Sequence, residues 1–526
     1  MLFNSYPFLL LFLPVTLIGY ILLGRTVGRG ASFGWLVAAS LFFYGWWNWF
    51  FLSLLLASLL FNYAAGTWLG KLDRHPPAKL VLGVALAFNL GFLGYFKYAN
   101  FFKENVNALL GANWPITEIL LPLGISFYTF QKIAYLVDSY QGKTRGYGFR
   151  DFCLFVSFFP QLIAGPITHH AEIMPQFRRQ DAARPLWEDW SVGLTLFVFG
   201  LSKKVLLADR LAGFASPVFH VARTGADFGM NEAWLGVLAY TLQLYFDFSG
   251  YSDMAIGLAR LFGIRLPMNF NSPYQAANIA DFWRRWHMTL SRFLRDYVYI
   301  PLGGNRHGTA RKYINLLLTM LIGGIWHGAG WTFVIWGALH GGYLLIYHAW
   351  SGGGEKHQIP NTKHQINSKL QTPSGGREQG AVPRTSASLR QIIIGRAVTF
   401  FLVTVAWVFF RAETFGAAKN LLVSMTGAHG FMSNWSRVHM MNGWLLVAVL
   451  LPVVWLLPNS HQLLARFQPT LEYLAVDNEA ASQTGPRWFA RFLWRPRRAW
   501  ALVVAALALA SILGLSRVSE FIYWQF

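Results

Sequence analysis

The sequence predicts an all-α polytopic membrane protein with about twelve transmembrane helices, and three observations support this fold class. Of the 526 residues, 54% are hydrophobic and only 13% are charged. Apolar stretches recur along the chain, and a helix of roughly 20 apolar residues is long enough to cross a bilayer. Lysine and arginine gather in short clusters between these stretches, as in cytoplasmic loops. The net charge of +21 is therefore assigned to membrane topology, and a lipid bilayer rather than nucleic acid is the expected partner.

The first span sets the orientation of the chain. Residues 8–23 are apolar and are followed by Arg25 and Arg29, which the positive-inside rule places in the cytoplasm. The N-terminus is therefore expected on the outer side of the membrane. The predicted spans are residues 8–23, 33–47, 51–69, 80–101, 116–140, 187–207, 233–262, 313–326, 331–350, 392–410, 444–457 and 499–515.

Two segments do not read as ordinary spans. Residues 152–164 are too few to cross the membrane upright and are broken by Gly165 and Pro166, which predicts a re-entrant or interfacial segment. Residues 280–300 carry four arginines among tryptophan, phenylalanine and tyrosine. Such a mixture predicts an amphipathic helix that lies at the cytoplasmic face or dips in among the other helices.

One composition change divides the chain. Residues 1–350 are expected to form the membrane core, and residues 392–526 to add C-terminal transmembrane helices to the same domain. Residues 351–391 are rich in Gly, Ser, Lys, Gln and Pro and are predicted to form a flexible cytoplasmic loop. The absence of an apparent internal repeat argues against a transporter built from duplicated halves. The single cysteine, Cys153, excludes an intrachain disulfide.

His327 is the first candidate for chemistry. It follows the apolar run 313–326, so it is expected at membrane depth, where a histidine is costly unless it faces protein or a water-filled cavity. Glycines at 323, 324, 328 and 330 allow neighbouring backbone or a ligand to come close to its ring. The alternative is a structural histidine that is hydrogen-bonded between helices.

The second candidate is the arginine-rich stretch that runs from Asp281 through His287. On a helix, Asp281 can reach Arg284 or Arg285, and Arg292 can reach Asp296. The remaining arginines are then free to face phosphate, either of lipid headgroups or of an acyl donor.

The third candidate is a polar patch in span 233–262. Asp247 and Asp253 either face an aqueous cavity as parts of a site or pair with arginines such as Arg284 and Arg285. His340 shares a helical hairpin with His327 and ranks lower, as do His169 and His170, which are expected in a surface loop.

The type of chemistry follows from which motifs are present. His287, His327 and His340 lack the short spacing of a metal motif, so no metal is expected. The sequence also has neither a glycine-rich phosphate loop after a strand nor a nucleophile-elbow serine. A histidine without such a nucleophile most naturally acts as a general base that deprotonates a hydroxyl.

Together these stretches resemble the membrane-bound O-acyltransferase family, in its bacterial branch of alginate O-acetylation. The resemblance covers nearly the whole chain, with the loop 351–390 as the main departure. It rests on the stretches 122–131 (PLGISFYTFQ), 159–166 (FPQLIAGP), 245–253 (YFDFSGYSD), 281–287 (DFWRRWH), 326–331 (WHGAGW), 407–411 (WVFFR) and 521–526 (FIYWQF).

The resemblance implies a core with central funnels open to both faces, with His327 as catalytic histidine and His287 as the second active-site position. It implies transfer of an acetyl group from acetyl-CoA, with no bound cofactor, in a bacterial inner membrane, which places the N-terminus in the periplasm. A periplasmic O-acetyltransferase partner and a polysaccharide synthase complex are the implied protein partners. The residues expected to bind substrate are Arg284, Arg285, Arg292, Trp283, Trp326, Asp247, Asp253 and Gln131.

Two further questions stay open at the level of sequence. Within the family, the acceptor can be alginate, with cellulose and peptidoglycan as alternatives. Outside it, a non-catalytic transporter or a scaffold of a polysaccharide secretion complex would also carry polar residues at membrane depth.

Overall fold

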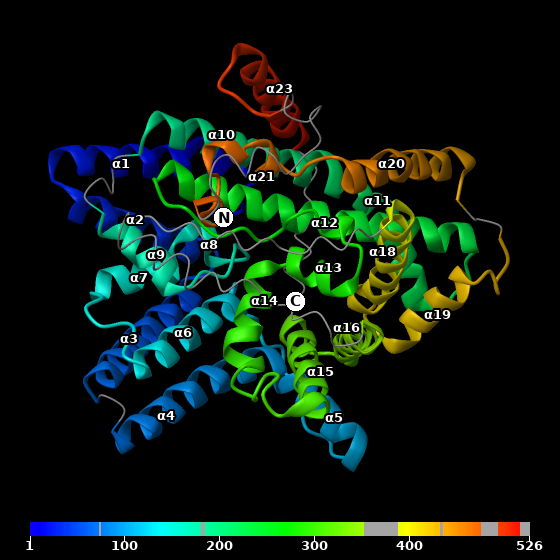
Figure 1. Cartoon of the computed structure of the whole chain (residues 1–526), viewed down its shortest axis with the longest axis horizontal. Coiled ribbons are helices and arrows are strands. Elements are labelled where there is room, and N and C mark those ends of the chain that lie inside the picture. Colours follow the sequence, from blue (N-terminus) through cyan, green and yellow to red (C-terminus); the bar gives the residue numbers. More distant parts are fainter. Residues whose placement is uncertain (73–74, 180–184, 352–387, 432–434, 475–492, 516–526) are drawn as a thin grey trace.

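The protein is a bundle of helices, with no strand in the part of the chain that the structure describes (Figure 1). A computed structural model describes residues 1–72, 75–179, 185–351, 388–431, 435–474 and 493–515. The helices up to the centre of the chain are α1 (Leu13–Thr26), α2 (Arg29–Gly45), α3 (Trp49–Leu72), α4 (Pro76–Leu93), α5 (Ala99–Leu110), α6 (Ile125–Tyr140), α7 (Phe149–Ser157), α8 (Phe159–Leu162), α9 (His170–Phe177), α10 (Trp187–Ser202), α11 (Asp209–Thr224) and α12 (Met230–Leu261). Those that follow are α13 (Ile279–Arg285), α14 (Met288–Leu294), α15 (Gly308–His327), α16 (Trp331–Trp350), α18 (Leu389–Arg411), α19 (Phe415–Met425), α20 (Arg437–Leu456), α21 (Ser460–Leu463) and α23 (Arg498–Gly514).

Helix α12 is the centre of the bundle. It is 32 residues long, is buried along almost its whole length, and runs across the middle of the molecule in Figure 1. It packs antiparallel to the continuous helix Trp187–Thr224, which comprises α10, a π-helical turn η3 (Lys203–Ala208) and α11. Helices α18, α19 and α20 also pack against it. A helix covered on all sides can carry polar residues, because they meet protein rather than lipid.

Glycines set the distance between α10 and α12. A Cβ atom on Gly200 would lie 2.4 Å from the carbonyl oxygen of Gly250, and one on Gly257 would lie 2.5 Å from that of Gly193. The two glycines on each helix are seven residues apart, so they fall on the same face of the helix. Only a residue without a side chain fits at these contacts, and the two backbones therefore approach each other closely.

The structure confirms the all-helical prediction but not the number of crossings. Six helical segments of the described residues are long and apolar enough to cross a membrane: Phe8–Thr26, Trp49–Leu72, Pro76–Leu110, Trp187–Thr224, Leu389–Arg411 and Arg437–Leu456. The predicted spans at α2, α12, α15, α16 and α23 are helical as well, but each is too short or too polar by that measure. In α12, the polar residues face other helices, because the helix is buried along almost its whole length.

Two predicted elements are wrong in detail. The expected span 116–140 is helical only from Ile125, because residues 111–122 form an irregular segment. The single amphipathic helix expected over 280–300 is instead two short helices with a break at His287: α13, and a continuous run of α14 and a π-helical turn η5 (Arg295–Tyr299). Residues 152–164 do form short helices, α7 and α8, which are buried in protein.

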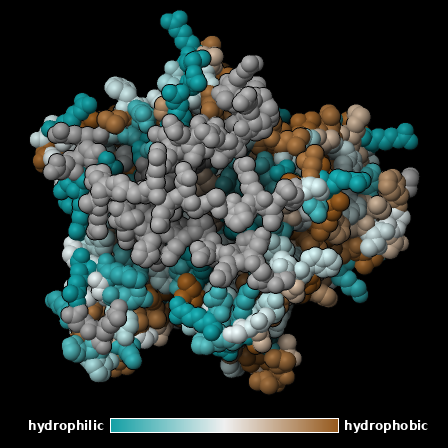
Figure 2. Space-filling view, in the orientation of Figure 1, coloured by the Kyte–Doolittle hydropathy of each residue, from teal (hydrophilic) through white to brown (hydrophobic). Residues whose placement is uncertain are grey.

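The outer surface is apolar where helices face away from the bundle. Exposed large hydrophobic side chains include Leu10 on the first segment, Leu445 and Val449 on α20 and Leu502 on α23. Figure 2 shows such brown patches over the region of α20. This distribution is that of a protein surrounded by lipid. Most of the predicted loop 351–391 lies outside the described residues, but its last residues from Leu389 already belong to α18. The C-terminal motif 521–526 lies outside the described residues.

The helix contact at Gly200 yields a stability prediction. Gly200→Ala places a methyl group against the backbone of α12, so we expect it to lower the free energy of unfolding by about 1–3 kcal/mol. Gly213→Ala on α11 is the matched control, because a Cβ there meets no atom within 4 Å. The control is expected to be neutral or slightly stabilising. Equal melting temperatures of the two purified variants in detergent would contradict the close contact.

Candidate active site

His327 is the last residue of α15 and lies in an aromatic enclosure. Its ring centroid is 4.9 Å from that of Trp326, 5.1 Å from Trp336 on α16 and 5.1 Å from Phe410 on α18. Only 3% of the residue is exposed. Three helices therefore position this imidazole in the interior of the bundle.

Glycines hold α15 and α16 together beside His327. A Cβ atom on Gly324 would lie 2.4 Å from the carbonyl oxygen of Phe333, and one on Gly337 would lie 2.6 Å from that of Met320. The expectation that glycines near His327 allow close approach of neighbouring backbone is confirmed at Gly324. The turn between the helices is equally tight, because a Cβ on Gly328 would meet the Phe333 ring.

His287 lies next to His327, at the break between α13 and α14. The two ring centroids are 6.4 Å apart. His287 has φ 43° and ψ 52°, a left-handed conformation that costs a non-glycine residue about 1–3 kcal/mol and is found most often at functional sites. Its Nδ1 atom is 3.0 Å from Asn269 Oδ1, and the residue is fully buried. The structure thus brings together the two histidines that the resemblance paired.

Lys97 holds the end of α15 and was not identified from the sequence. It belongs to a π-helical turn, η2 (Gly94–Tyr98), and its Nζ donates hydrogen bonds to the carbonyl oxygens of Trp326, at 2.5 Å, and His327, at 3.1 Å. The last carbonyls of a helix have no partner within the helix and attract a cation. A lysine inside the apolar run 80–101 was the signal, since a charged residue at membrane depth is a candidate for function.

The arginine-rich segment has more local partners than predicted. Arg285 Nε donates to Asp281 at 3.0 Å, as expected. The main partner of Arg292 is not Asp296, as predicted, but Glu172 on α9, because Arg292 binds both carboxylate oxygens of Glu172. Asp296 pairs with Arg295 at 2.8 Å and also interacts electrostatically with Arg292. The fold brings Glu172 close to Arg292, and the two oxygens of its carboxylate accept hydrogen bonds from two nitrogens of the guanidinium group. Arg284 is the exposed arginine of α13.

Trp326, Trp283 and Gln131, which were also predicted to bind substrate, lie at different distances from the histidine pair. Trp326 contacts both histidines, with ring centroids 4.9 Å from His327 and 6.0 Å from His287. Trp283 lies one layer further out, 5.2 Å from the buried His340 ring. Gln131 donates to Thr168 Oγ1 at 3.0 Å and is 4% exposed, so its amide is engaged in the protein core.

Asp247 and Asp253 pair with lysines, not with Arg284 or Arg285, the partners that the sequence suggests. Lys204 Nζ lies 2.7 Å from Asp247, and Lys203 Nζ lies 2.6 Å from Asp253. Both lysines belong to the π-helical turn η3, which packs against α12. Asp253 also contacts His461 of α21 at 3.0 Å. These pairs neutralise charge in the interior, which is how buried carboxylates are normally accommodated.

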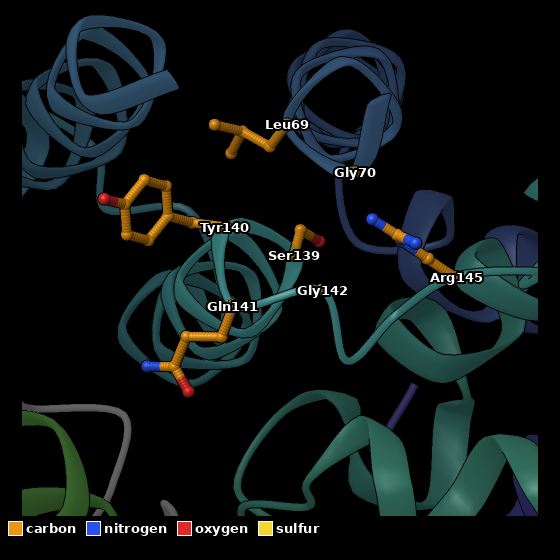
Figure 3. Close-up of a pocket in the computed structure, with 7 residues that line it drawn as sticks. All are labelled: Leu69, Gly70, Ser139, Tyr140, Gln141, Gly142 and Arg145. Atoms are coloured by element: carbon orange, nitrogen blue, oxygen red, sulfur yellow. The ribbon is translucent and has the colours of Figure 1, made fainter. Parts of the chain in front are cut away.

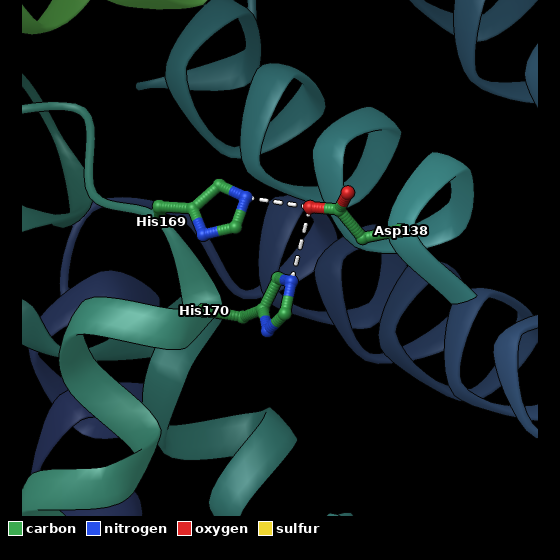
Figure 4. Close-up of side chains that lie close together, drawn as sticks. All are labelled: Asp138, His169 and His170. Carbon is green, nitrogen blue, oxygen red and sulfur yellow. Dashed lines mark hydrogen bonds and ion pairs between the residues drawn. The ribbon is translucent and has the colours of Figure 1, made fainter. Parts of the chain in front are cut away.

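A second polar cluster joins α6, α9 and η5. Figure 4 shows its aspartate and its two histidines. Asp138 Oδ2 accepts hydrogen bonds from His169 Nε2 at 2.6 Å, His170 Nε2 at 3.1 Å and Tyr297 Oη at 2.8 Å. His170 is 1% exposed. The expectation of a surface loop at His169 and His170 is therefore wrong, because the fold turns both rings inward onto a carboxylate that is distant in sequence.

The ligand atoms of Asp138, His169 and His170 lie within 4.8 Å of one another, which is also the spacing of a metal site. The hydrogen-bond pattern favours another role. His169 Nδ1 accepts the backbone N–H of Ala171, so its proton is on Nε2, the atom that faces Asp138. A histidine that ligates a metal normally donates a hydrogen bond through its other nitrogen, whereas His169 Nδ1 accepts one. The cluster anchors η5, and with it α14, to α6 and α9.

Two cavities lie among the described residues away from the histidine pair, and neither is lined by His327 or His287. One, of about 290 Å³, lies where α3 and α6 end (Figure 3), and is lined by Leu69, Gly70, Ser139, Tyr140, Gln141, Gly142 and Arg145. The other, of about 260 Å³, is lined by residues of α18, α19 and the turn after it. The central funnels expected from the resemblance are not confirmed.

Comparisons with known proteins identify a matching family and several relatives. The family description "MBOAT, membrane-bound O-acyltransferase family" matches residues 141–369. The chain is 42% identical to a peptidoglycan O-acetyltransferase of Helicobacter pylori over 82% of this chain and 80% of that protein. It is 37% identical to a probable alginate O-acetylase AlgI of Pseudomonas putida over the full length of both, and 42% identical to one of Azotobacter vinelandii over 81% of this chain and 78% of that protein.

The matched residues include the arginine-rich segment and both helix breaks, with His287 at one break and His327 at the other. The relatives cover most of the chain on both sides of that region. The apolar helical segments indicate a multi-pass membrane protein. The names of the relatives, a peptidoglycan O-acetyltransferase and a probable alginate O-acetylase, indicate acetyl transfer. The chain belongs to the membrane-bound O-acyltransferase family and is a membrane O-acetyltransferase.

Proposed function

We propose that the protein takes an acetyl group from acetyl-CoA at the cytoplasmic face of the inner membrane and transfers it for O-acetylation of an exopolysaccharide, with His327 as the general base. Alginate is the first candidate for this polymer. The observation that carries the proposal is the pair of buried imidazoles, His327 and His287, placed side by side by two helix breaks. A positioned histidine is the commonest general base in enzymes.

The geometry of the pair suits a hydroxyl acceptor. The ring centroids are 6.4 Å apart. A shared oxygen atom would form hydrogen bonds of about 2.8 Å to both rings when one nitrogen of each ring turns toward it. His327 would remove the proton as the oxygen attacks the thioester carbonyl. His287 would orient the reacting group or assist the proton transfer. Burial in an apolar enclosure keeps competing water away from the thioester.

Polar atoms without hydrogen-bond partners surround the same region. In the described part of the chain these include Nε1 of Trp326, Nε1 of Trp336 and both ring nitrogens of His340. Buried polar groups are normally satisfied, so a cluster of such atoms supports binding of polar substrate groups or water there. Because His327 is enclosed, substrates would reach it only after contacting side chains such as Trp336 or Phe410 move.

The donor would bind with its phosphates near α13. Arg284 is exposed and Arg285 is half-buried, whereas the charge of Arg292 is already balanced by Glu172. Among the three predicted arginines, Arg284 is therefore the first contact for phosphate and Arg285 the second. The thioester would point inward from Arg284 toward His327. The acetyl group would cross the membrane in this way to a hydroxyl that arrives from the periplasmic side.

The protein would act together with two protein partners. A periplasmic O-acetyltransferase would complete transfer to the polymer, and a polysaccharide synthase complex would supply it. The peptidoglycan O-acetyltransferase relative, at 42% identity, makes peptidoglycan a specific second acceptor; cellulose is a third. The positive-inside rule supports a periplasmic N-terminus, since Arg25 and Arg29 follow the first span.

The base assignment is tested with His327→Ala. We expect acetyl transfer from radiolabelled acetyl-CoA in membrane vesicles to fall by about 10³-fold or more, because the attacking hydroxyl loses its base. His220→Ala, on an exposed face of α11, is the matched control and should keep full activity. Retained transfer in a folded His327→Ala protein would refute the assignment. A transporter or scaffold would leave no label on any acceptor.

The second histidine gives an independent prediction. His287→Ala is expected to lose most of the activity, by about 10²-fold, because one of the two imidazoles that face the reacting group is gone. The same vesicle assay measures the loss, with gel-filtration behaviour as the check on folding. Near-normal turnover would assign His287 to anchoring alone.

Because Asp247 and Asp253 are paired with lysines, we expect their substitution to lower stability rather than substrate binding. Asp247→Asn leaves Lys204, which is 2% exposed, with Asp209 as its remaining carboxylate partner in the ion-pair network. Because Asp209 still balances the charge of Lys204, we expect the loss of one charged hydrogen bond, about 1.5–3 kcal/mol, and a lower melting temperature. The KM for acetyl-CoA of the protein that remains folded should be unchanged. A raised KM at normal stability would return Asp247 to substrate binding.

A further inference from the structure

Asn269 binds three consecutive residues at the helix break. Its backbone carbonyl accepts the N–H of Met288 at 2.9 Å. Its side-chain Oδ1 lies 3.0 Å from His287 Nδ1 and accepts the hydroxyl of Thr289 at 2.9 Å. Asn269, His287 and Thr289 are each no more than 2% exposed. The left-handed backbone of His287 is therefore held by one residue from the segment between α12 and α13.

The contacts of the Asn269 side chain with Ser252 and Thr289 determine which way its amide group is oriented. Its Nδ2 donates to Ser252 Oγ on α12 at 3.1 Å. Thr289 Oγ1 already accepts the backbone N–H of Ile167 at 3.0 Å, so its own proton is directed to Asn269 Oδ1. Both contacts place the oxygen of the amide, and not its nitrogen, against His287.

An oxygen at that position accepts a hydrogen bond, so His287 Nδ1 must carry the proton. The opposite nitrogen, Nε2, then has a lone pair; it is buried and has no hydrogen-bond partner among the described residues. The rings in contact with His287 are those of Phe127, Phe248, Phe270, Trp326 and His327. His327 is thus the titratable ring that faces it, with Lys97 and His340 behind.

We propose that Asn269 is a positioning residue that holds His287 in the Nδ1-protonated tautomer, so that Nε2 accepts a hydrogen bond from an O–H or N–H group of a substrate beside His327. The proposal rests on the proposed function, in which both histidines face the reacting groups. In it, His287 works only as a neutral hydrogen-bond acceptor. Protonation of His287 would remove that lone pair and stop the reaction.

The decisive variant is Asn269→Asp. Aspartate is nearly isosteric and still accepts from His287 and Thr289, but its negative charge stabilises the protonated imidazole. We expect a rate close to wild type at alkaline pH and an acidic limb of the pH–rate profile that moves upward by about one pH unit or more. The assay is the initial rate of CoA thiol release from acetyl-CoA in membrane vesicles that carry the full-length protein.

Asn269→Ala and a matched control complete the experiment. Asn269→Ala removes the acceptor, so we expect a loss of about 10²-fold in kcat at every pH. Asn89→Asp is the control, because Asn89 is equally buried, 1% exposed, and its side-chain amide donates to Asn62 and to the carbonyl oxygen of Ala85 rather than to a histidine. Its acidic limb should match that of the wild type.

The outcomes separate the two proposals. An unchanged acidic limb in Asn269→Asp, or wild-type kcat in Asn269→Ala, overturns the role of Asn269 even if His327→Ala is inactive. An active His327→Ala protein instead overturns the proposed function. If Asn269→Ala does not fold, the nearly isosteric Asp variant still decides, because a purely structural role predicts no shift of its pH profile.

Discussion

The approach of the His327 and His287 rings depends on two interruptions of helical structure. One is the end of α15, where Lys97 takes up the last carbonyl groups. The other is the left-handed turn at His287, which Asn269 holds through backbone and side chain. In an apolar interior a free backbone carbonyl or N–H is costly, so each break requires a nearby polar side chain. The position of the candidate site follows from where such partners exist.

The same requirement explains the buried charges around the central helix. Asp247 and Asp253 lie in α12, and Lys203 and Lys204 meet them from the π-helical turn η3. A π-helical turn inserts an extra residue and changes which side chains face the neighbour. Close packing at glycine contacts brings the backbones near enough for these pairs to form. Charge neutralisation and close packing thus support each other in this part of the bundle.

Much of the site could be predicted from the sequence because the relevant signals are local. Histidine at the end of an apolar run, glycines around it, and an i, i+4 pair of Asp281 with Arg285 are all visible without a fold. Partners distant in sequence were missed or misassigned. Arg292 pairs with Glu172, and His169 turns inward onto Asp138, because helices far apart in the chain pack together. Lys97 is visible in the sequence as a charged residue inside an apolar run, but nothing in the sequence indicates that it binds the carbonyl groups of Trp326 and His327.

By itself the sequence determined that this chain is an all-helical membrane protein with a histidine at the end of an apolar run, since hydropathy, charge clusters and glycine spacing are properties of neighbouring residues. Only the tertiary structure decided which helices lie outermost, where His287 sits, and which residue holds its ring. Those features depend on contacts such as Asn269 with His287, eighteen residues apart, and Lys97 with His327, 230 residues apart. Packing free energy and hydrogen-bond satisfaction in the whole bundle select such contacts, and no local pattern encodes them.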